Sequence, residues 1–237
     1  MTQAEPYAKD WRLAYRDLKA QIELGRLAPG ASLPTLAELA GAYGLTTHGA
    51  RRVMARLKED GRVESWRGFG HRVSEKRFEY RIDERPRFGA NMARLGRNNG
   101  SDVVATRAVR LSPKLARSMR LRAGTRVYQT EIVRYVEGRP VVLSQNHFPL
   151  DRFEGIDTAL TKSKSVTRAL ALHGVDDYSR ERTRIEVRMP NAHESLQLGI
   201  PSNQPVLVST GTNVDRDGQV VELTHSVWRG DCVTFEI

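Results

Sequence analysis

The chain has 237 residues, 39% of them apolar, and a formal net charge of +10 at pH 7. That length accommodates one large or two ordinary domains, and no apolar run is long enough for a membrane-spanning helix. The single cysteine, Cys232, excludes an internal disulfide and a cysteine zinc site. Residues 1–11 lack a secretory pattern, so we expect a cytoplasmic protein. The basic excess favours a polyanionic partner.

Two helical patterns open the chain. The first covers residues 6–27, with one apolar side formed by Trp11, Tyr15, Leu18 and Ile22. The second follows Thr35, because Thr35 and Glu38 form a capping box in which each side chain satisfies a backbone N–H of the other's turn. Its apolar residues recur at helical spacing, at Leu36, Leu39, Ala40 and Tyr43. Gly44 ends this helix, since glycine adopts the left-handed conformation without strain.

A third helix is expected after Thr46, which can cap it. One apolar stripe is formed by Ala50, Val53, Met54 and Leu57. The opposite face carries His48 and Arg52, with Arg51 on its flank. A second helix that turns polar and basic residues outward, joined to the first by a tight glycine turn, is typical of a helix-turn-helix DNA reader.

A basic hairpin follows the reader helix. Residues 63–66 and 71–73 are expected as short strands, and the RGFG sequence between them supplies two glycines for a tight turn. Such a hairpin is a wing that can follow the DNA backbone or enter the minor groove. Its GxG is not a dinucleotide fingerprint, because no helix follows it. Residues 1–74 are therefore predicted to form a winged helix-turn-helix DNA-binding domain.

The charged segment 75–87 is interpreted as a linker, and residues 88–237 as a second domain. We expect helices over 88–96, 112–121 and 165–173, and a further one after a capping box at 191–194. Strands are expected over 103–111, 126–136, 140–148, 183–189, 205–214, 219–228 and 233–235. Successive hairpins with peripheral helices predict an α+β domain on an antiparallel sheet.

The second domain shows no catalytic motif: GxSxG, HExxH and P-loop patterns are missing, and the histidines lack metal-ligand spacing. We therefore expect neither an enzyme nor a bound metal or cofactor. Polar side chains do lie on its expected strands, among them Arg134, Ser144, Asn146, His147, Glu222 and Ser226. They fit either the solvent face of a sheet or a small-molecule pocket in which an arginine holds an anion.

Residues 11–73 resemble the winged-helix domain of GntR-type bacterial repressors. The matching positions are Gly25, Leu27, Pro29, Gly30, Leu33, Pro34, Glu38, Leu39, Ala40, Gly44, Arg51, Leu57, Gly61, Val63, Gly68 and Gly70. Residues 86–237 resemble the UTRA effector domain of the HutC branch, which has a chorismate-lyase-like fold. The resemblance rests on the RF–N–M–G run from Arg87 to Gly96, the hairpin 132–149, DRDG at 215–218 and residues 222–235. The RPRFGANM run with NHFP is most similar to the phosphonate-utilisation regulators of that branch.

The resemblance implies two sets of functional residues. DNA contacts fall at Thr35, Thr46, Thr47, His48, Arg51, Arg52, Arg67, Gly68 and His71, where Arg51 has a base-contact role and Arg67, Gly68 and His71 form the wing tip. Effector contacts fall at Arg87, Phe88, Asn91, Arg134, Ser144, His147 and Glu222. The chain has Thr47 where the family has a base-reading arginine, which predicts an altered operator sequence, and Ile132 where sugar-phosphate relatives have a second arginine.

These observations predict a homodimeric regulator, and we expect a repressor. It would bind an inverted-repeat operator and respond to a small anionic metabolite such as a phosphonate or phosphate compound. Two alternatives stay open at this point. The protein could be a constitutive DNA-binding protein without a ligand, which the missing arginine at 132 keeps in view. It could also be a lyase-like enzyme, although an enzyme has no use for a winged helix-turn-helix.

Overall fold

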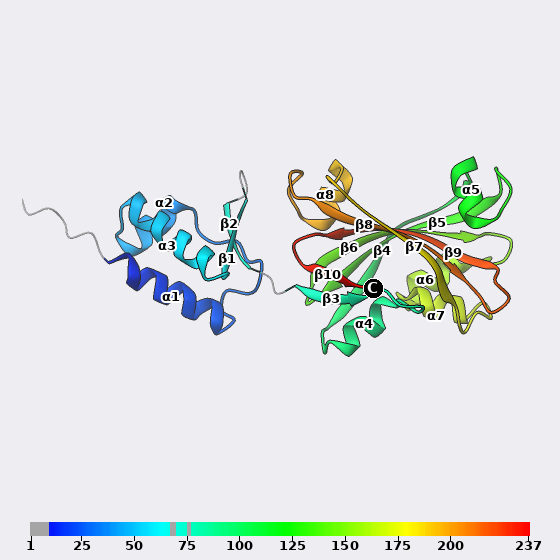
Figure 1. The fold of residues 1–237 in the computed structure, drawn as a ribbon, viewed down its shortest axis with the longest axis horizontal. Helices are drawn as coiled ribbons and strands as arrows, with labels where there is room; N and C mark the ends of the chain where they lie inside the picture. The colour runs from blue at the N-terminus through cyan, green and yellow to red at the C-terminus, as the bar shows by residue number, and fades with distance from the viewer. Residues whose placement is uncertain (1–9, 67–69, 75–76) are drawn as a thin grey trace, which may run out of the picture. The chain divides into compact units, whose positions relative to one another are not determined.

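The structure is a computed structural model that describes residues 10–66, 70–74 and 77–237. The chain divides between residues 76 and 77 into two compact units (Figure 1). No helix in the described ranges is long and apolar enough to cross a membrane.

The described part of the first unit has three helices and a hairpin, which are α1 Trp11–Glu23, α2 Leu36–Tyr43, α3 Thr47–Glu59, β1 Val63–Trp66 and β2 Gly70–Val73. The capping box of Thr35 and Glu38 is present, and Gly44 ends α2 with a φ of 62°. Helix α1 begins at Trp11, where the Asp10 side chain caps it, and it ends at Glu23, before the end of the pattern over 6–27; residues 6–9 lie outside the described ranges.

The core of the first unit contains the expected stripe of α3. Ala50, Val53 and Leu57 are fully buried, and Met54 is 2% exposed. They pack with Leu39 of α2, Leu18 of α1 and the two valines that end the hairpin register, Val63 and Val73. The helix-turn-helix with its wing is thus held together by apolar burial on one side of each helix.

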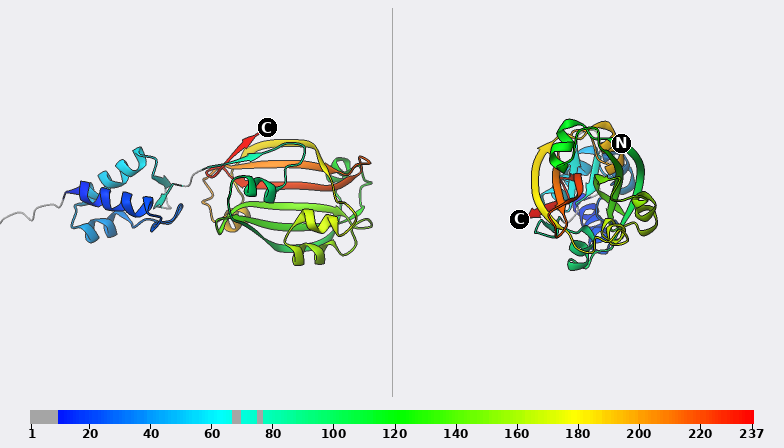
Figure 2. Two further views of the ribbon diagram at one scale, coloured as in Figure 1. Left: turned by 90° about the horizontal axis from the view of Figure 1, so that it is seen from below. Right: turned by 90° about the vertical axis from the view of Figure 1, so that its right-hand side faces the viewer.

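The second unit is built on a six-stranded antiparallel sheet in the order β4-β5-β6-β9-β8-β7, whose strands lie side by side in Figure 2. Their bounds are β4 Asn99–Arg110, β5 Arg126–Val136, β6 Arg139–Pro149, β7 Ser179–Arg188, β8 Val206–Val214 and β9 Val220–Arg229. The β5–β6 turn uses Glu137 and Gly138 at positive φ, as a tight hairpin requires. The predicted α+β class with an antiparallel sheet is confirmed.

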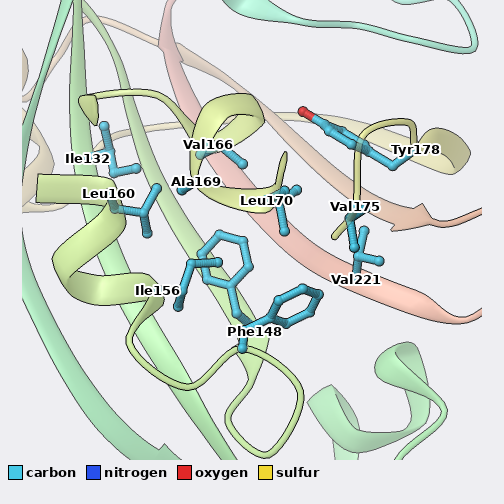
Figure 3. Close-up of a cluster of buried hydrophobic side chains, with 11 residues drawn as sticks. Ile132, Phe148, Ile156, Leu160, Val166, Ala169, Leu170, Val175, Tyr178 and Val221 are labelled. Carbon is cyan, nitrogen blue, oxygen red and sulfur yellow. The ribbon is translucent and has the colours of Figure 1, made fainter. Parts of the chain in front are cut away.

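Five helices border the sheet: α4 Phe88–Arg94, α5 Pro113–Met119, α6 Ile156–Ser163, α7 Val166–Ala171 and α8 Ala192–Leu198. Helices α6 and α7 cover one face, where their apolar residues pack on Ile132, Phe148 and Val221 (Figure 3). Helices α5 and α8 pack on side chains of the opposite face, such as Val127 and Val133. Helix α6 was not predicted, because it begins after Gly155 without a side-chain cap.

The segment 75–87, interpreted from the sequence as a linker, contains a strand of the second unit. Strand β3, Phe78–Arg81, pairs in parallel with the C-terminal strand β10, Val233–Glu236. Phe78 and Tyr80 are buried and the residues between and after them are exposed, which is the two-residue period of a half-buried strand. The charges at Glu79 and Arg81 lie on the exposed side and hide that period in the sequence.

Candidate nucleic-acid interface and effector cavity

The exposed face of α3 presents the side chains expected to read DNA. Thr47, His48 and Arg51 are exposed at the start of the helix, and the Thr46 hydroxyl caps it by accepting the Gly49 N–H at 3.1 Å. Within the described ranges Arg51 makes no side-chain hydrogen bond or ion pair. A long cation on the first two turns of such a helix can reach a base edge.

Three other residues of the expected DNA set are already engaged within the first unit. The Arg52 guanidinium lies 4.7 Å from the centre of the Trp11 ring, so it ties α3 to α1. The Thr35 hydroxyl is 2.9 Å from a Glu38 carboxylate oxygen inside the capping box. Thr46 is the N-cap of α3. These three side chains therefore stabilise the helix-turn-helix through contacts within the first unit.

The wing is described on both of its strands. His71 lies opposite Ser65 in the β1–β2 register, and its Nδ1 is 2.8 Å from the Ser65 hydroxyl oxygen. Burial lowers the pKa of His71, with a smaller contribution from the charge of Lys58. This shift disfavours a positive charge on the His71 imidazole. Arg67 and Gly68, expected at the wing tip, lie outside the described residues.

A cavity of about 600 Å³ opens on the sheet face that carries α6 and α7. Among the described residues, its lining contains one carboxylate, Glu222, and five cationic side chains, which are Arg87, Arg134, Lys164, Arg168 and Arg180. Lys164 is paired with Asp102 at 2.8 Å and Arg87 with Asp177 at 3.1 Å, which leaves a net positive interior. Such a cavity has the size and charge to hold a small anion.

Hydroxyl groups from neighbouring strands form the floor of this cavity. Arg134 of β5 donates to the Ser144 hydroxyl of β6 at 2.7 Å, and Ser144 lies 2.9 Å from Ser226 of β9. The Thr224 hydroxyl continues the network and donates to the Asn146 side-chain oxygen at 2.9 Å. Ser144 and Ser226 are buried, so these side chains do not form the solvent face of a sheet, one of the two possibilities left open by the sequence.

Aromatic rings flank the cationic groups. The Arg134 guanidinium lies 5.7 Å from the centre of the Phe88 ring, and Arg87 lies 4.8 Å from that of Tyr178. The Tyr178 hydroxyl is 2.9 Å from the Thr167 hydroxyl of α7. Ring faces held in this way fix the direction in which each guanidinium can donate.

Glu222 is the acidic group of the cavity. Its carboxylate is 4% exposed and accepts a hydrogen bond from the Asn213 amide at 2.5 Å. Burial raises the pKa of Glu222, while the charges of Arg180 and Arg134 act in the opposite direction. Five of the seven expected effector residues, Arg87, Phe88, Arg134, Ser144 and Glu222, are therefore brought together around one cavity.

The other two expected effector residues lie outside the cavity lining. The Asn91 amide oxygen accepts the Arg81 N–H at 2.8 Å and its nitrogen donates to the Arg81 carbonyl at 3.2 Å, so this side chain fastens α4 to β3. His147 points to the opposite face of the sheet, where Gln129 donates to its Nε2 at 3.0 Å. Burial lowers the pKa of His147. His147 is three residues from Ser144 on β6, an odd spacing, so the two side chains face opposite sides of the sheet.

Sequence reasoning missed Arg180, Asn213 and Tyr178, which also line the cavity. Arg180 sits in the run SRERTR, which looks like an ordinary exposed strand. Asn213 and Tyr178 stand at strand ends, where polar residues are common. Arg180 and Asn213 are brought together only by the pairing of β7 with β8, and no local sequence pattern encodes that pairing.

The family follows from comparison with known proteins. Residues 94–234 match the UTRA domain family, and residues 12–73 match the family described as bacterial regulatory proteins, gntR family. The chain is a GntR-family regulator with a UTRA domain.

The regulator is similar along its length to named transcription factors. It is 27% identical over 232 residues to the probable transcriptional regulator PhnF of Escherichia coli (strain K12), with 93% of each chain covered. It is 25% identical over 218 residues to the transcriptional repressor NagR of Bacillus subtilis (strain 168), which covers 92% of this chain and 89% of NagR. The crystal structure of PhnF from Mycobacterium smegmatis superposes with a TM-score of 0.64 at 23% identity, covering 94% and 97% of the two chains. These matches support the fold and the resemblance to the PhnF-type regulators.

The structural role of Asn91 in the regulator can be tested by Asn91→Ala. The substitution leaves the Arg81 backbone groups without their partner, and we expect a loss of about 1–3 kcal/mol in the free energy of unfolding. Chemical denaturation measures it, and exposed Asn203→Ala is the matched control. A variant of unchanged stability that no longer responds to effector would show that Asn91 binds ligand instead.

Proposed function

We propose that this protein is a homodimeric DNA-binding repressor that a small anion, a phosphate or phosphonate compound, releases from its operator. The observation that carries the proposal is the cavity in which five cationic side chains face one carboxylate within the domain attached to the DNA reader. A buried anion needs charge-assisted hydrogen bonds, and guanidinium groups and hydroxyls are the donors that bind phosphoryl and carboxylate oxygens best.

The cavity is joined covalently to the reader. Six of its lining residues belong to the segment 80–89, which begins within strand β3 and leads back to residue 77 at the start of the second unit. A ligand that repositions Arg87 or Phe88 acts directly on this segment. We therefore infer that occupancy changes the spacing of the two reader domains in a dimer, to the extent that the ligand binds the two states unequally.

The ligand-free alternative differs from the proposal in one measurable respect. A constitutive DNA-binding protein has no reason to keep Arg134 and Arg180 around a single carboxyl group, Glu222, because the surplus positive charge lowers stability unless a ligand compensates it. Titration of operator-bound protein with phosphate, phosphonates and sugar phosphates separates the two. Turnover of an added compound would instead support the lyase-like enzyme.

Dimerisation gives the first prediction of the proposal. One reader helix contacts only a few base pairs, so tight operator binding requires two readers related by two-fold symmetry. We expect sedimentation to show a particle of twice the 26.7 kDa chain mass and footprinting to show an inverted repeat. A monomer that binds one half-site tightly contradicts the dimer.

Arg51 gives the second prediction. Arg51→Ala is expected to weaken operator binding by about 1–3 kcal/mol and to relax preference at one base pair, because a bidentate base contact is lost. Arg67→Ala is expected to weaken binding to operator and unrelated DNA alike and to reduce the salt dependence. Fluorescence anisotropy on both DNAs measures this, with Arg56→Ala as control, since Arg56 is paired with Glu59. Equal losses on both DNAs for Arg51→Ala rule out base reading.

Arg134 gives the third prediction. Arg134→Ala removes a charged donor from the cavity floor but leaves the reader unchanged, so operator affinity should stay at the wild-type value. Release should require at least about tenfold more of the anion that acts on the wild type. Exposed Arg122→Ala is the control for loss of charge. Release of the Arg134 variant at the wild-type anion concentration would falsify a sensing role for this cavity.

A further inference from the structure

Arg180 is a cation of the cavity to which the sequence analysis assigned no role. It stands near the start of β7, is largely buried and donates from Nε to the Asn213 side-chain oxygen at 2.7 Å. Its Nη1 lies 3.3 Å from the Thr183 hydroxyl. In the part of the chain that the structure describes, no carboxylate lies within ion-pairing distance of it. Burial lowers the pKa of Arg180, so the charge is held against the cost of its desolvation.

The position of this guanidinium depends on Gly211. A Cβ atom added to Gly211 would lie 1.9 Å from Nη1 and 2.4 Å from Cζ of Arg180. The φ of Gly211 is not in the left-handed region, so glycine is needed here for space and not for backbone conformation. The Arg180 guanidinium of β7 thus occupies the space that a side chain at position 211 of β8 would fill.

Arg180 interacts electrostatically with the same carboxyl group as Arg134, that of Glu222. Asn213 donates to Glu222 and accepts from Arg180, so it bridges the two without a direct ion pair. The charges of Arg180 and Arg134 both act on Glu222 and on Tyr80. Two guanidinium groups therefore act on one carboxyl group, so these three side chains together carry a net positive charge.

We propose that Arg180, seated over Gly211, is a second anion-binding residue of the effector cavity, and that with Glu222 it selects an anion that also carries an ammonium or hydroxyl group. This inference rests on the proposed function. The anion would lie between Arg134 and Arg180. Position 132 on β5 is a buried isoleucine and supplies no cation. The second guanidinium comes instead from β7, the edge strand on the other side of the sheet.

The donor group in the ligand follows from Glu222. Glu222 repels a bound anion to the extent that its carboxyl group is ionised, whereas an ammonium or hydroxyl on the same molecule donates to the carboxylate and removes that repulsion. Inorganic phosphate and a simple alkylphosphonate lack such a group at a distance from their charge. We therefore expect the affinity to differ among ligands that share one anionic head group.

Three matched probes test this ranking on the full chain: 2-aminoethylphosphonate, 2-hydroxyethylphosphonate and ethylphosphonate. Titration calorimetry on the wild type should show that the amino or hydroxy probe binds at least about tenfold tighter than ethylphosphonate. Glu222→Gln should reduce this preference. Arg180→Gln should weaken all three probes by about tenfold or more, and Gly211→Ala should do the same by displacing the guanidinium. Exposed Arg182→Gln, on the same strand, should change nothing.

The outcomes separate this inference from the proposed function. If Arg134→Ala abolishes binding while Arg180→Gln and Gly211→Ala bind as the wild type does, Arg180 has no role in the site and the sensing cavity stands. If ethylphosphonate binds the wild type as tightly as the other probes, the selection by Glu222 is wrong. If no probe binds the wild type, the ligand class is wrong. Thermal melting of each variant shows that it is folded, and Arg180→Lys, which keeps the charge, should restore part of the affinity.

Discussion

The parallel pairing of β3 with β10 is the contact on which the organisation of the second unit depends. It places the first described residues after the reader beside the last strand of the chain, and Arg81 and Glu236 close the pair with an ion pair at 3.0 Å. Tyr80 of β3 then packs against Trp228 of β9, with ring centres 4.5 Å apart, and against Phe88. These rings are also a wall of the cavity. Apolar burial that stabilises the domain therefore also determines the shape of its binding site.

The elements predicted correctly from the sequence are those whose ends and hydrophobic periodicity are set by neighbouring residues. The capping boxes at Thr35 and Asn191, the proline after Ser112 and the turns of the β5–β6 and β8–β9 hairpins are all short-range signals, and the structure has them where they were expected. The features that were missed depend on long-range pairing. Strand β3 is recognisable only from the two-residue alternation of Phe78 and Tyr80, and α6 lacks a capping side chain. Asn91 and His147 were expected in the effector cavity because of the family resemblance. The Asn91 side chain instead binds the backbone of β3, and His147 lies on the opposite face of the sheet.

Basic residues differ in whether a nearby carboxylate compensates their charge. In the second unit many arginines are paired, as where Arg85 and Arg87 share Asp177 and where Arg188 is bound by Glu194. These pairs contribute little to long-range attraction of DNA, since their charges are compensated nearby. In the first unit Arg51 has no such partner among the described residues. The net charge of +10 is therefore a poor guide to which surface meets nucleic acid, and the pairing of each side chain is a better one.

The seat of Arg180 on Gly211 makes two distant positions interdependent. Any larger residue at 211 collides with the guanidinium in its present position, and a short residue at 180 removes the group that requires a glycine there. In homologous chains these two sites should therefore change together: an arginine at 180 with glycine at 211, or neither. A set of UTRA-domain sequences could then be divided by this pair alone, before any ligand is known, into those that bring a cation from the β7 edge and those that do not.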